Sequence, residues 1–140
     1  MTAPQVVVSS EAGLAQEVVT DRHRWQADEP EPAGTDTGPS PYELLLSSLG
    51  ACTSMTLRLY AQRKGFDLRR ITVRLQHHRI YAEDCRDCET KQGMVDHIDR
   101  EIELTGNLSE EQKQRLLEIA ERCPIHRTLT SEIRIQTSVL

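Results

Sequence analysis

Two cysteines that are far apart in the sequence could form a redox pair. Cys52 and Cys123 lie on the apolar faces of the two segments with the strongest helical pattern, and basic and polar residues follow each of them. A single thiol among apolar residues is usually inert packing, but two thiols that the fold brings together can form a reactive pair. A redox role therefore depends on whether the fold brings the sulfurs of Cys52 and Cys123 together.

Cys85 and Cys88 form a CxxC motif in a polar, acidic stretch. Such a pair can be half of a zinc site, a disulfide or an idle pair. Zinc would need two more ligands; His77 and His78 point to opposite faces of a strand, which leaves one of them and His97 across a hairpin. Because no second CxxC or HxxxH exists, we expect no metal here, and a loop-stiffening or accessory redox role stays open.

The composition limits the class of partner. A chain of 140 residues is expected to form a single domain, 1–140, that buries roughly two thirds of its unfolded surface. Its net charge of -5 argues against nucleic acid or an anionic membrane as a partner, because both need clustered Lys and Arg. A small or neutral ligand fits better.

The cellular location is expected to be cytoplasmic. Met1–Thr20 has neither Lys or Arg nor a long apolar run, so it does not resemble a secretory signal. The charge-free segment Leu44–Leu57 is too short to span a bilayer and contains several Ser and Thr. Since the cytoplasm keeps thiols reduced unless they are catalytic or bind metal, at least one cysteine pair is expected to have a chemical role.

The first forty residues predict strands and a loop. The Val-rich runs Gln5–Ser10 and Ala15–Trp25 predict two strands joined by a short turn. Residues 28–41 contain four Pro and two Gly, which predicts an irregular loop.

A long helix is expected to follow. Ser40 is a predicted N-cap, Pro41 takes the first helical position and Glu43 completes a capping box. The helix should run to Lys64 and end at Gly65. Its apolar residues lie nearly all around the axis, which predicts a helix buried on most sides.

The second half predicts strands, a helix and a closing strand. Apolar residues alternate in two stretches, at Ile71, Val73 and Leu75 and at Ile98, Ile102 and Leu104, the latter with Arg100 in the same register. A long hairpin connection, Ala82–Asp96, is expected between them.

A second capping box, Ser109 to Gln112, starts a helix whose inward face includes Cys123. Because Pro124 disfavours helical geometry at the residue before it, this thiol should lie at the helix end. Alternation in Ile133–Val139 predicts a last strand. The fold class is therefore α+β, with helices packed on one face of an antiparallel sheet.

These residues resemble a known family. The run GPSPYELLLSSLGACTSMTL, residues 38–57, followed by ERCPIHRTL, residues 121–129, resembles the OsmC/Ohr family of thiol-dependent peroxide reductases. The similarity extends from the DEP loop to the last strand. It implies an OsmC-like fold and an intertwined homodimer, with a buried central helix and active sites at the subunit boundary.

The resemblance also implies the chemistry. Cys52 would be the peroxidatic cysteine and Cys123 the resolving one, reducing an organic hydroperoxide without a cofactor and being reduced in turn by an external dithiol. A buried thiol needs a nearby cation to ionise, and the family takes an arginine from the N-terminal strands. Arg22 and Arg24 would point to the same side of a strand, and Arg24 is favoured.

One position departs from the family pattern. Family peroxidases have a glutamate ten residues before the first cysteine, where this chain has Tyr42, and Glu43 is one residue later. One helical residue is about 100° of rotation, so capping explains Glu43 better than contact with the arginine. His126 and Arg127 either tune Cys123 or meet the dipole at a helix end.

Two classes of function remain open. The first is a dithiol peroxidase built on Cys52 and Cys123. The second is a non-catalytic module of the same fold, which holds a small hydrophobic ligand in an apolar cleft, with or without a metal at the Cys85/Cys88 loop.

Overall fold

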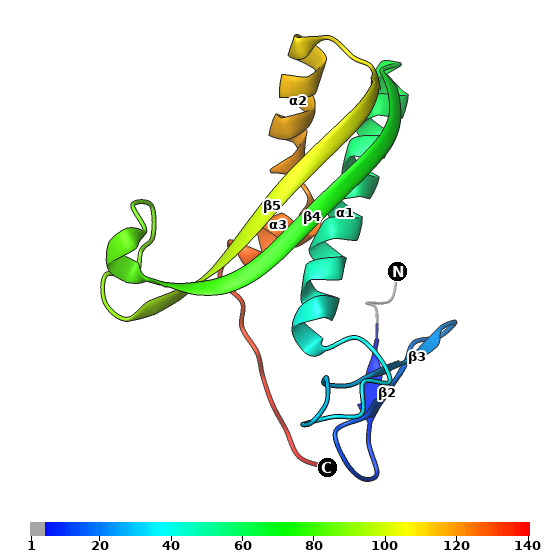
Figure 1. The fold of residues 1–140 in the computed structure, drawn as a ribbon, viewed down its shortest axis with the longest axis vertical. Coiled ribbons are helices and arrows are strands. Elements are labelled where there is room, and N and C mark those ends of the chain that lie inside the picture. Colours follow the sequence, from blue (N-terminus) through cyan, green and yellow to red (C-terminus); the bar gives the residue numbers. More distant parts are fainter. Residues whose placement is uncertain (1–4) are drawn as a thin grey trace. The chain divides into compact units, whose positions relative to one another are not determined.

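The computed structural model describes residues 5–140, which divide into two compact units with the boundary between Leu45 and Leu46. Residues 1–4, the start of the segment tested above for a secretory signal, lie outside the described part. Among residues 5–140, antiparallel sheets combine with three α-helices, so the predicted α+β class is confirmed (Figure 1).

The N-terminal unit contains a three-stranded antiparallel sheet in the order β1 (Val7–Ser9), β2 (Gln16–Val19) and β3 (Arg24–Ala27). The predicted single strand Ala15–Trp25 is therefore wrong. A turn interrupts it, because the Thr20 hydroxyl accepts hydrogen bonds from the backbone N–H groups of Arg22 (3.4 Å) and His23 (3.1 Å).

This turn changes the placement of the two candidate arginines. Arg22 lies in the turn, whereas Arg24 is the first residue of β3 and pairs with Glu17 at 3.5 Å. The expectation that both point to one side of a strand is not met.

The predicted loop at residues 28–41 is confirmed up to Ser40 and is organised by one buried carboxylate. Asp28 accepts hydrogen bonds from the hydroxyls of Thr35 (2.7 Å) and Thr37 (2.8 Å) and from the backbone N–H of Glu29 (2.8 Å). The hydrogen bonds from Thr35, Glu29 and Thr37 hold the pKa of Asp28 far below its usual range, so it stays charged at any ordinary pH. The loop therefore has a fixed structure where it leads into the first helix.

The long helix α1 (Pro41–Lys64) has the predicted ends. The Ser40 backbone N–H donates to Glu43 Oε1 (2.9 Å) and the Glu43 N–H donates to Ser40 Oγ (3.3 Å), which confirms the capping box. Gly65 ends the helix with a φ of 72°, a left-handed conformation that glycine adopts without strain.

A long hairpin dominates the C-terminal unit. Strands β4 (Asp67–Tyr81) and β5 (Met94–Asn107) pair antiparallel as far as the Tyr81–Met94 rung. The connection is therefore residues 82–93, shorter than the predicted 82–96. It contains a turn of 3₁₀ helix, η1 (Ala82–Asp84), and a disulfide between Cys85 and Cys88.

Two helices follow the hairpin, α2 (Glu110–Ala120) and α3 (Pro124–Leu129). The capping box of Ser109 and Gln112 is confirmed. Cys123 faces inward as predicted, but α2 ends three residues earlier, and Pro124 opens α3, a helix that the sequence did not predict. Proline suits this position because the first turn of a helix needs no N–H at that residue.

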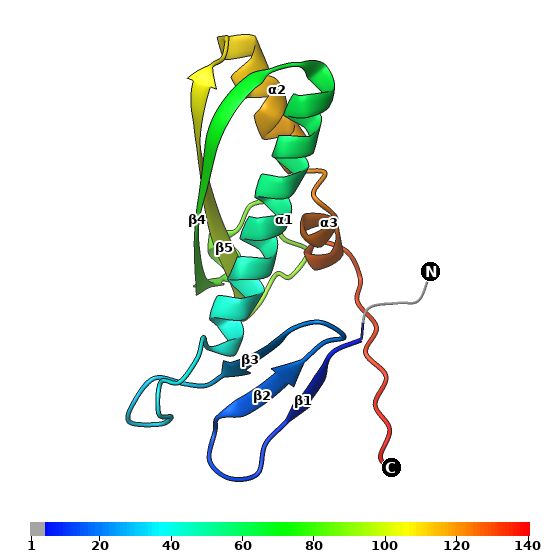
Figure 2. The ribbon, with the colours of Figure 1, turned by 90° about the vertical axis from the view of Figure 1, so that its right-hand side faces the viewer.

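Residues 46–64 of α1 pack with α2 and α3 on one face of the hairpin (Figure 2). The core between them is formed by Leu57, Tyr60, Ala61, Leu68, Leu116, Ile119 and Ala120. Gly50 allows α1 to lie close to β4, since a Cβ atom there would be 2.8 Å from Leu75 Cδ1. The helix carrying Cys52 is thus held firmly against the hairpin.

One side of α1 is exposed in the single chain, contrary to the prediction of a helix buried on most sides. Met55 and Leu59, one turn apart, are 65% and 66% exposed. The prediction failed because an all-round apolar pattern does not say whether the covering elements belong to the same chain.

The predicted strand Ile133–Val139 is also wrong. Residues 132–140 form no helix or strand, and Ile135 is 85% exposed. Alternation makes an extended segment favourable, but a strand also needs a partner for its backbone groups. None of the helices among residues 5–140 has the length and apolar composition that crossing a membrane requires.

Candidate functional site

The structure brings the two sulfurs together. Cys52 is in the middle of α1 and partly buried, while Cys123 is fully buried at the N-cap of α3. Their side chains are hydrogen-bonded to each other, and neither belongs to a disulfide. A disulfide requires two sulfurs to come together, and the sulfurs of Cys52 and Cys123 already interact.

The two thiols shift each other's pKa in opposite directions. Burial acts to raise the pKa of Cys123, but hydrogen bonds to its sulfur from Cys52, from the backbone N–H groups of His126 and Ile125 and from Thr53 together lower it. Burial and the neighbouring Cys123 raise the pKa of Cys52. The two shifts go in opposite directions, so the apparent pKa values belong to the pair of thiols together.

A polar network supports this pair from the side of the hairpin. Thr53, which has no exposed surface, donates from its hydroxyl to the Leu49 carbonyl oxygen at 2.7 Å. The same hydroxyl oxygen accepts a hydrogen bond from Arg100 Nη1 at 3.1 Å. Because Thr53 also contacts the Cys123 sulfur, the guanidinium of Arg100 is linked to the thiols through one side chain.

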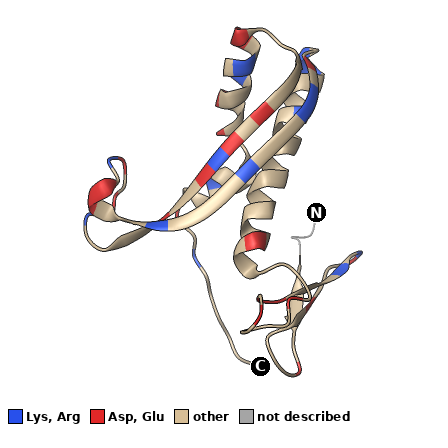
Figure 3. Cartoon of the chain, in the orientation of Figure 1, with Lys and Arg blue, Asp and Glu red and all other residues tan. Residues whose placement is uncertain are grey.

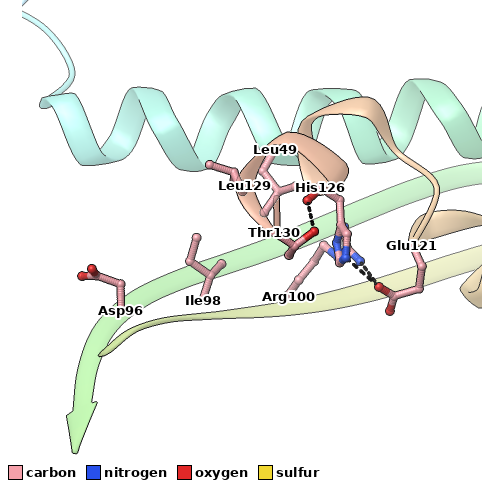
Figure 4. Close-up of a pocket in the computed structure, with 8 residues that line it drawn as sticks. All are labelled: Leu49, Asp96, Ile98, Arg100, Glu121, His126, Leu129 and Thr130. Carbon is pink, nitrogen blue, oxygen red and sulfur yellow. Dashed lines mark hydrogen bonds and ion pairs between the residues drawn. The ribbon is translucent and has the colours of Figure 1, made fainter. Parts of the chain in front are cut away.

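Arg100 and His126 share a carboxylate (Figure 4). Glu121 Oε2 lies 3.8 Å from Arg100 Nη2 and 2.9 Å from His126 Nε2. The Arg100 side chain is only 11% exposed, so its charge is largely shielded from water. His126, expected to tune Cys123 or to meet a helix dipole, therefore contributes its backbone N–H to the sulfur and its ring to Glu121.

Arg100, Glu121 and His126 line a cavity of about 400 Å³ between α1, β5 and α3. Its other described lining residues are Leu49, Asp96, Ile98, Leu129 and Thr130. Neither Cys52 nor Cys123 is among the described residues that line it. The cavity is therefore lined by Arg100, Glu121 and His126 of the polar network and not by the two cysteines.

Sequence reasoning missed Thr53, Arg100 and Glu121. A signal existed for Arg100, because it occupies an inward position in an otherwise apolar alternation. A charged residue on an apolar strand face needs a polar partner, and here the partners are the buried Thr53 and the exposed Glu121. Thr53 and Glu121 lie within the two motifs but carry no signal of their own.

The remaining predicted site residues have no described contact with the thiols. Arg22, Arg24 and Glu43 belong to the N-terminal unit, and the carboxylate of Glu43 takes part in the capping box. Arg127 is exposed in α3. The roles assigned to these residues beside the thiols stay predictions.

The coupling of the thiols can be tested by removing one sulfur at a time. In Cys52→Ala, the pKa of Cys123 should rise, because its sulfur loses the S–H donor while remaining buried. In Cys123→Ala, the pKa of Cys52 should fall, because the neighbour that raises it is gone. Thiolate absorbance near 240 nm against pH, with Cys85 and Cys88 kept oxidised, measures both. Unchanged values in both variants would show that the sulfurs do not interact.

The central helix with one cysteine, the hairpin packed against it and the second cysteine before a proline agree with the resemblance to OsmC-like proteins. The model of the OsmC-like protein family matches residues 34–138. The chain therefore belongs to the OsmC-like family, as the resemblance implied. A search of curated proteins finds no significant match.

Solved structures share the fold at low sequence identity. The OsmC-like protein of Mycoplasma pneumoniae is 22% identical with a TM-score of 0.72, covering 91% of this chain and 87% of its own. An organic hydroperoxide resistance protein OsmC from Legionella pneumophila is 18% identical with a TM-score of 0.64, covering 90% and 89%. The organic hydroperoxide resistance protein OhrB of Bacillus subtilis is 18% identical with a TM-score of 0.61, covering 92% and 91%.

Proposed function

We propose that this protein is a thiol-dependent peroxidase that reduces organic hydroperoxides through Cys52 and Cys123. The observation that carries the proposal is the hydrogen-bonded contact between two reduced sulfurs that are distant in sequence. Family membership supports it, as do structural relatives named for resistance to organic hydroperoxides.

The proposed reaction has three steps. The sulfur of Cys52 attacks the peroxide and the O–O bond breaks. Cys52 becomes a sulfenic acid, and the leaving alkoxide takes up the proton that the Cys52 thiol has lost, which gives an alcohol. Cys123 then attacks the sulfenic sulfur, giving a disulfide and water. An external dithiol returns both cysteines to thiols and is itself oxidised to a disulfide.

The difference in burial between the two cysteines supports the attacking role for Cys52. Cys123 has no exposed surface, whereas Cys52 is only partly buried and is the one that a substrate can reach. We assign the cation beside the reacting Cys52 to Arg24, or to Arg22, following the family resemblance.

The functional unit in this proposal is a homodimer. Met55 and Leu59 form an exposed apolar stripe on the helix that carries Cys52. If a second copy of the chain covers Met55 and Leu59, their apolar surface is removed from water, which stabilises the dimer. In such a dimer the attacking cysteine would lie near the subunit boundary.

Counting thiols tests the function. In a Cys85→Ser/Cys88→Ser background, the two remaining thiols per chain should disappear after one equivalent of cumene hydroperoxide and return after treatment with a dithiol. This background removes the loop disulfide, so the dithiol restores only the pair under test. A hydrophobic ligand-binding module would keep both thiols, and that result would overturn the proposal.

A further inference from the structure

A second group of chemically active side chains lies on the outer face of the hairpin. His78 of β4 and His97 of β5 are direct partners in the antiparallel ladder. Because side chains alternate along a strand, Asp99, two residues beyond His97, projects from the same face. Two strands thus present two imidazoles and one carboxylate together, on the face opposite to that of Arg100.

The distances between these groups suit a metal ion. His97 Nε2 is 2.9 Å from Asp99 Oδ1, and His78 Nδ1 is 3.8 Å from Asp99 Oδ2. One ligand atom from each of the three residues lies within 4.8 Å of the others. Zinc bound to nitrogen and oxygen at about 2.0–2.2 Å in a tetrahedron needs ligand atoms roughly 3.3–3.5 Å apart. Small side-chain rotations therefore suffice to reach this geometry.

The register of the hairpin fixes the two imidazoles side by side. Their ring centroids are 4.8 Å apart with an interplanar angle of 36°. The three side chains are each about half exposed, so an ion can reach them from solvent. Other charged residues lie along the same hairpin (Figure 3). Arg74 of β4 and Glu103 of β5, for example, form an exposed ion pair.

The opposite face of the same hairpin offers a comparison. There His77 lies 2.9 Å from Asp96, a distance equal to that between His97 and Asp99. The two pairs differ because no second imidazole joins His77 and Asp96 in a three-residue cluster among the described residues. His77 and Asp96 supply one imidazole and one carboxylate, and Arg79 Nε also lies 3.8 Å from Asp96 Oδ1. A second imidazole, as in the His78 and His97 cluster, supplies the third ligand of a metal site.

We propose that His78, His97 and Asp99 bind a transition-metal ion such as Zn²⁺. Two nitrogen ligands and one carboxylate favour zinc and its transition-metal neighbours over Ca²⁺ or Mg²⁺, which prefer oxygen ligands alone. Three protein ligands leave the fourth position to water or to an exchangeable group. The loop cysteines take no part, because Cys85 and Cys88 are joined to each other.

The test uses the full chain with Cys52 and Cys123 replaced by Ser, so that no free thiol competes for the metal. Without reductant the loop disulfide stays closed. Zn²⁺ affinity is measured by competition with a chromophoric chelator, and Co²⁺ absorbance reports the coordination. We expect one ion per chain, and His97→Gln should weaken binding by at least about 10-fold.

Matched variants decide the outcome. His77→Gln should bind Zn²⁺ as the parent does, whereas His78→Gln should lose affinity as His97→Gln does. These substitutions lie on exposed or partly exposed strand positions, and circular dichroism checks that each variant is folded. Failure of the parent to bind Zn²⁺, or an equal loss in His77→Gln, would overturn the proposal. Neither result bears on the peroxidase, whose cysteines are absent from the experiment.

Discussion

Cys52→Ser should lower the turnover of organic hydroperoxide by on the order of 10³-fold or more, the scale of loss when a nucleophile is removed. A serine hydroxyl has almost the same size as the thiol, but it does not ionise near neutral pH and cannot form a sulfenic acid. Steady-state consumption of cumene hydroperoxide with a dithiol as electron donor measures the effect.

Cys123→Ser should block the second step of the reaction, formation of the disulfide, whereas Cys52→Ser blocks the first. Cys52 is still present, so the first equivalent of peroxide should be consumed and leave a sulfenic acid that dimedone traps. The Cys85→Ser/Cys88→Ser variant is the matched control and should turn over like the parent, because its two substitutions lie in the hairpin connection. If instead Cys123→Ser abolished the first turnover and Cys52→Ser did not, the roles of the two thiols would have to be exchanged.

The parts of this fold that follow from neighbouring residues could be predicted from sequence. Ser40 and Glu43 bond each other three residues apart, so the start of α1 could be located without knowing the rest of the molecule. The same holds for Ser109 and Gln112 at the start of α2. Alternation also predicted the two hairpin strands, because one face of each packs inward.

The parts that depend on distant residues could not be predicted. The Val-rich run before Trp25 contains no glycine or proline, so the Thr20 hydroxyl bonds that turn the chain left no strong signal. The bond from Arg100 to Thr53 joins residues 47 apart in sequence, and only the packed hairpin brings them together. Ile133–Val139 has the pattern of a strand, but pattern does not supply a pairing strand.

Thr53→Val should reduce the free energy of unfolding by about 1–3 kcal/mol, although valine has nearly the same shape. Thr53 is fully buried, and its hydroxyl is the acceptor for Nη1 of an arginine that is only 11% exposed. Valine would leave that N–H without its acceptor in a place that water barely reaches. The pKa of Cys123 should also rise, because its sulfur loses the Thr53 hydrogen bond. Urea unfolding and thiolate absorbance measure the two effects.

Thr53→Ser separates the hydroxyl from the methyl group. Serine keeps the oxygen and loses one buried methyl, so stability should fall by about 1 kcal/mol while the pKa of Cys123 stays near that of the parent. The hydroxyl oxygen of residue 53 accepts a hydrogen bond from Arg100. Its own proton must therefore point away from Arg100, toward the Leu49 carbonyl oxygen or the Cys123 sulfur. If Thr53→Val left the pKa of Cys123 unchanged, the hydroxyl would serve only to satisfy Arg100, and the hairpin would have no influence on the thiols through this contact.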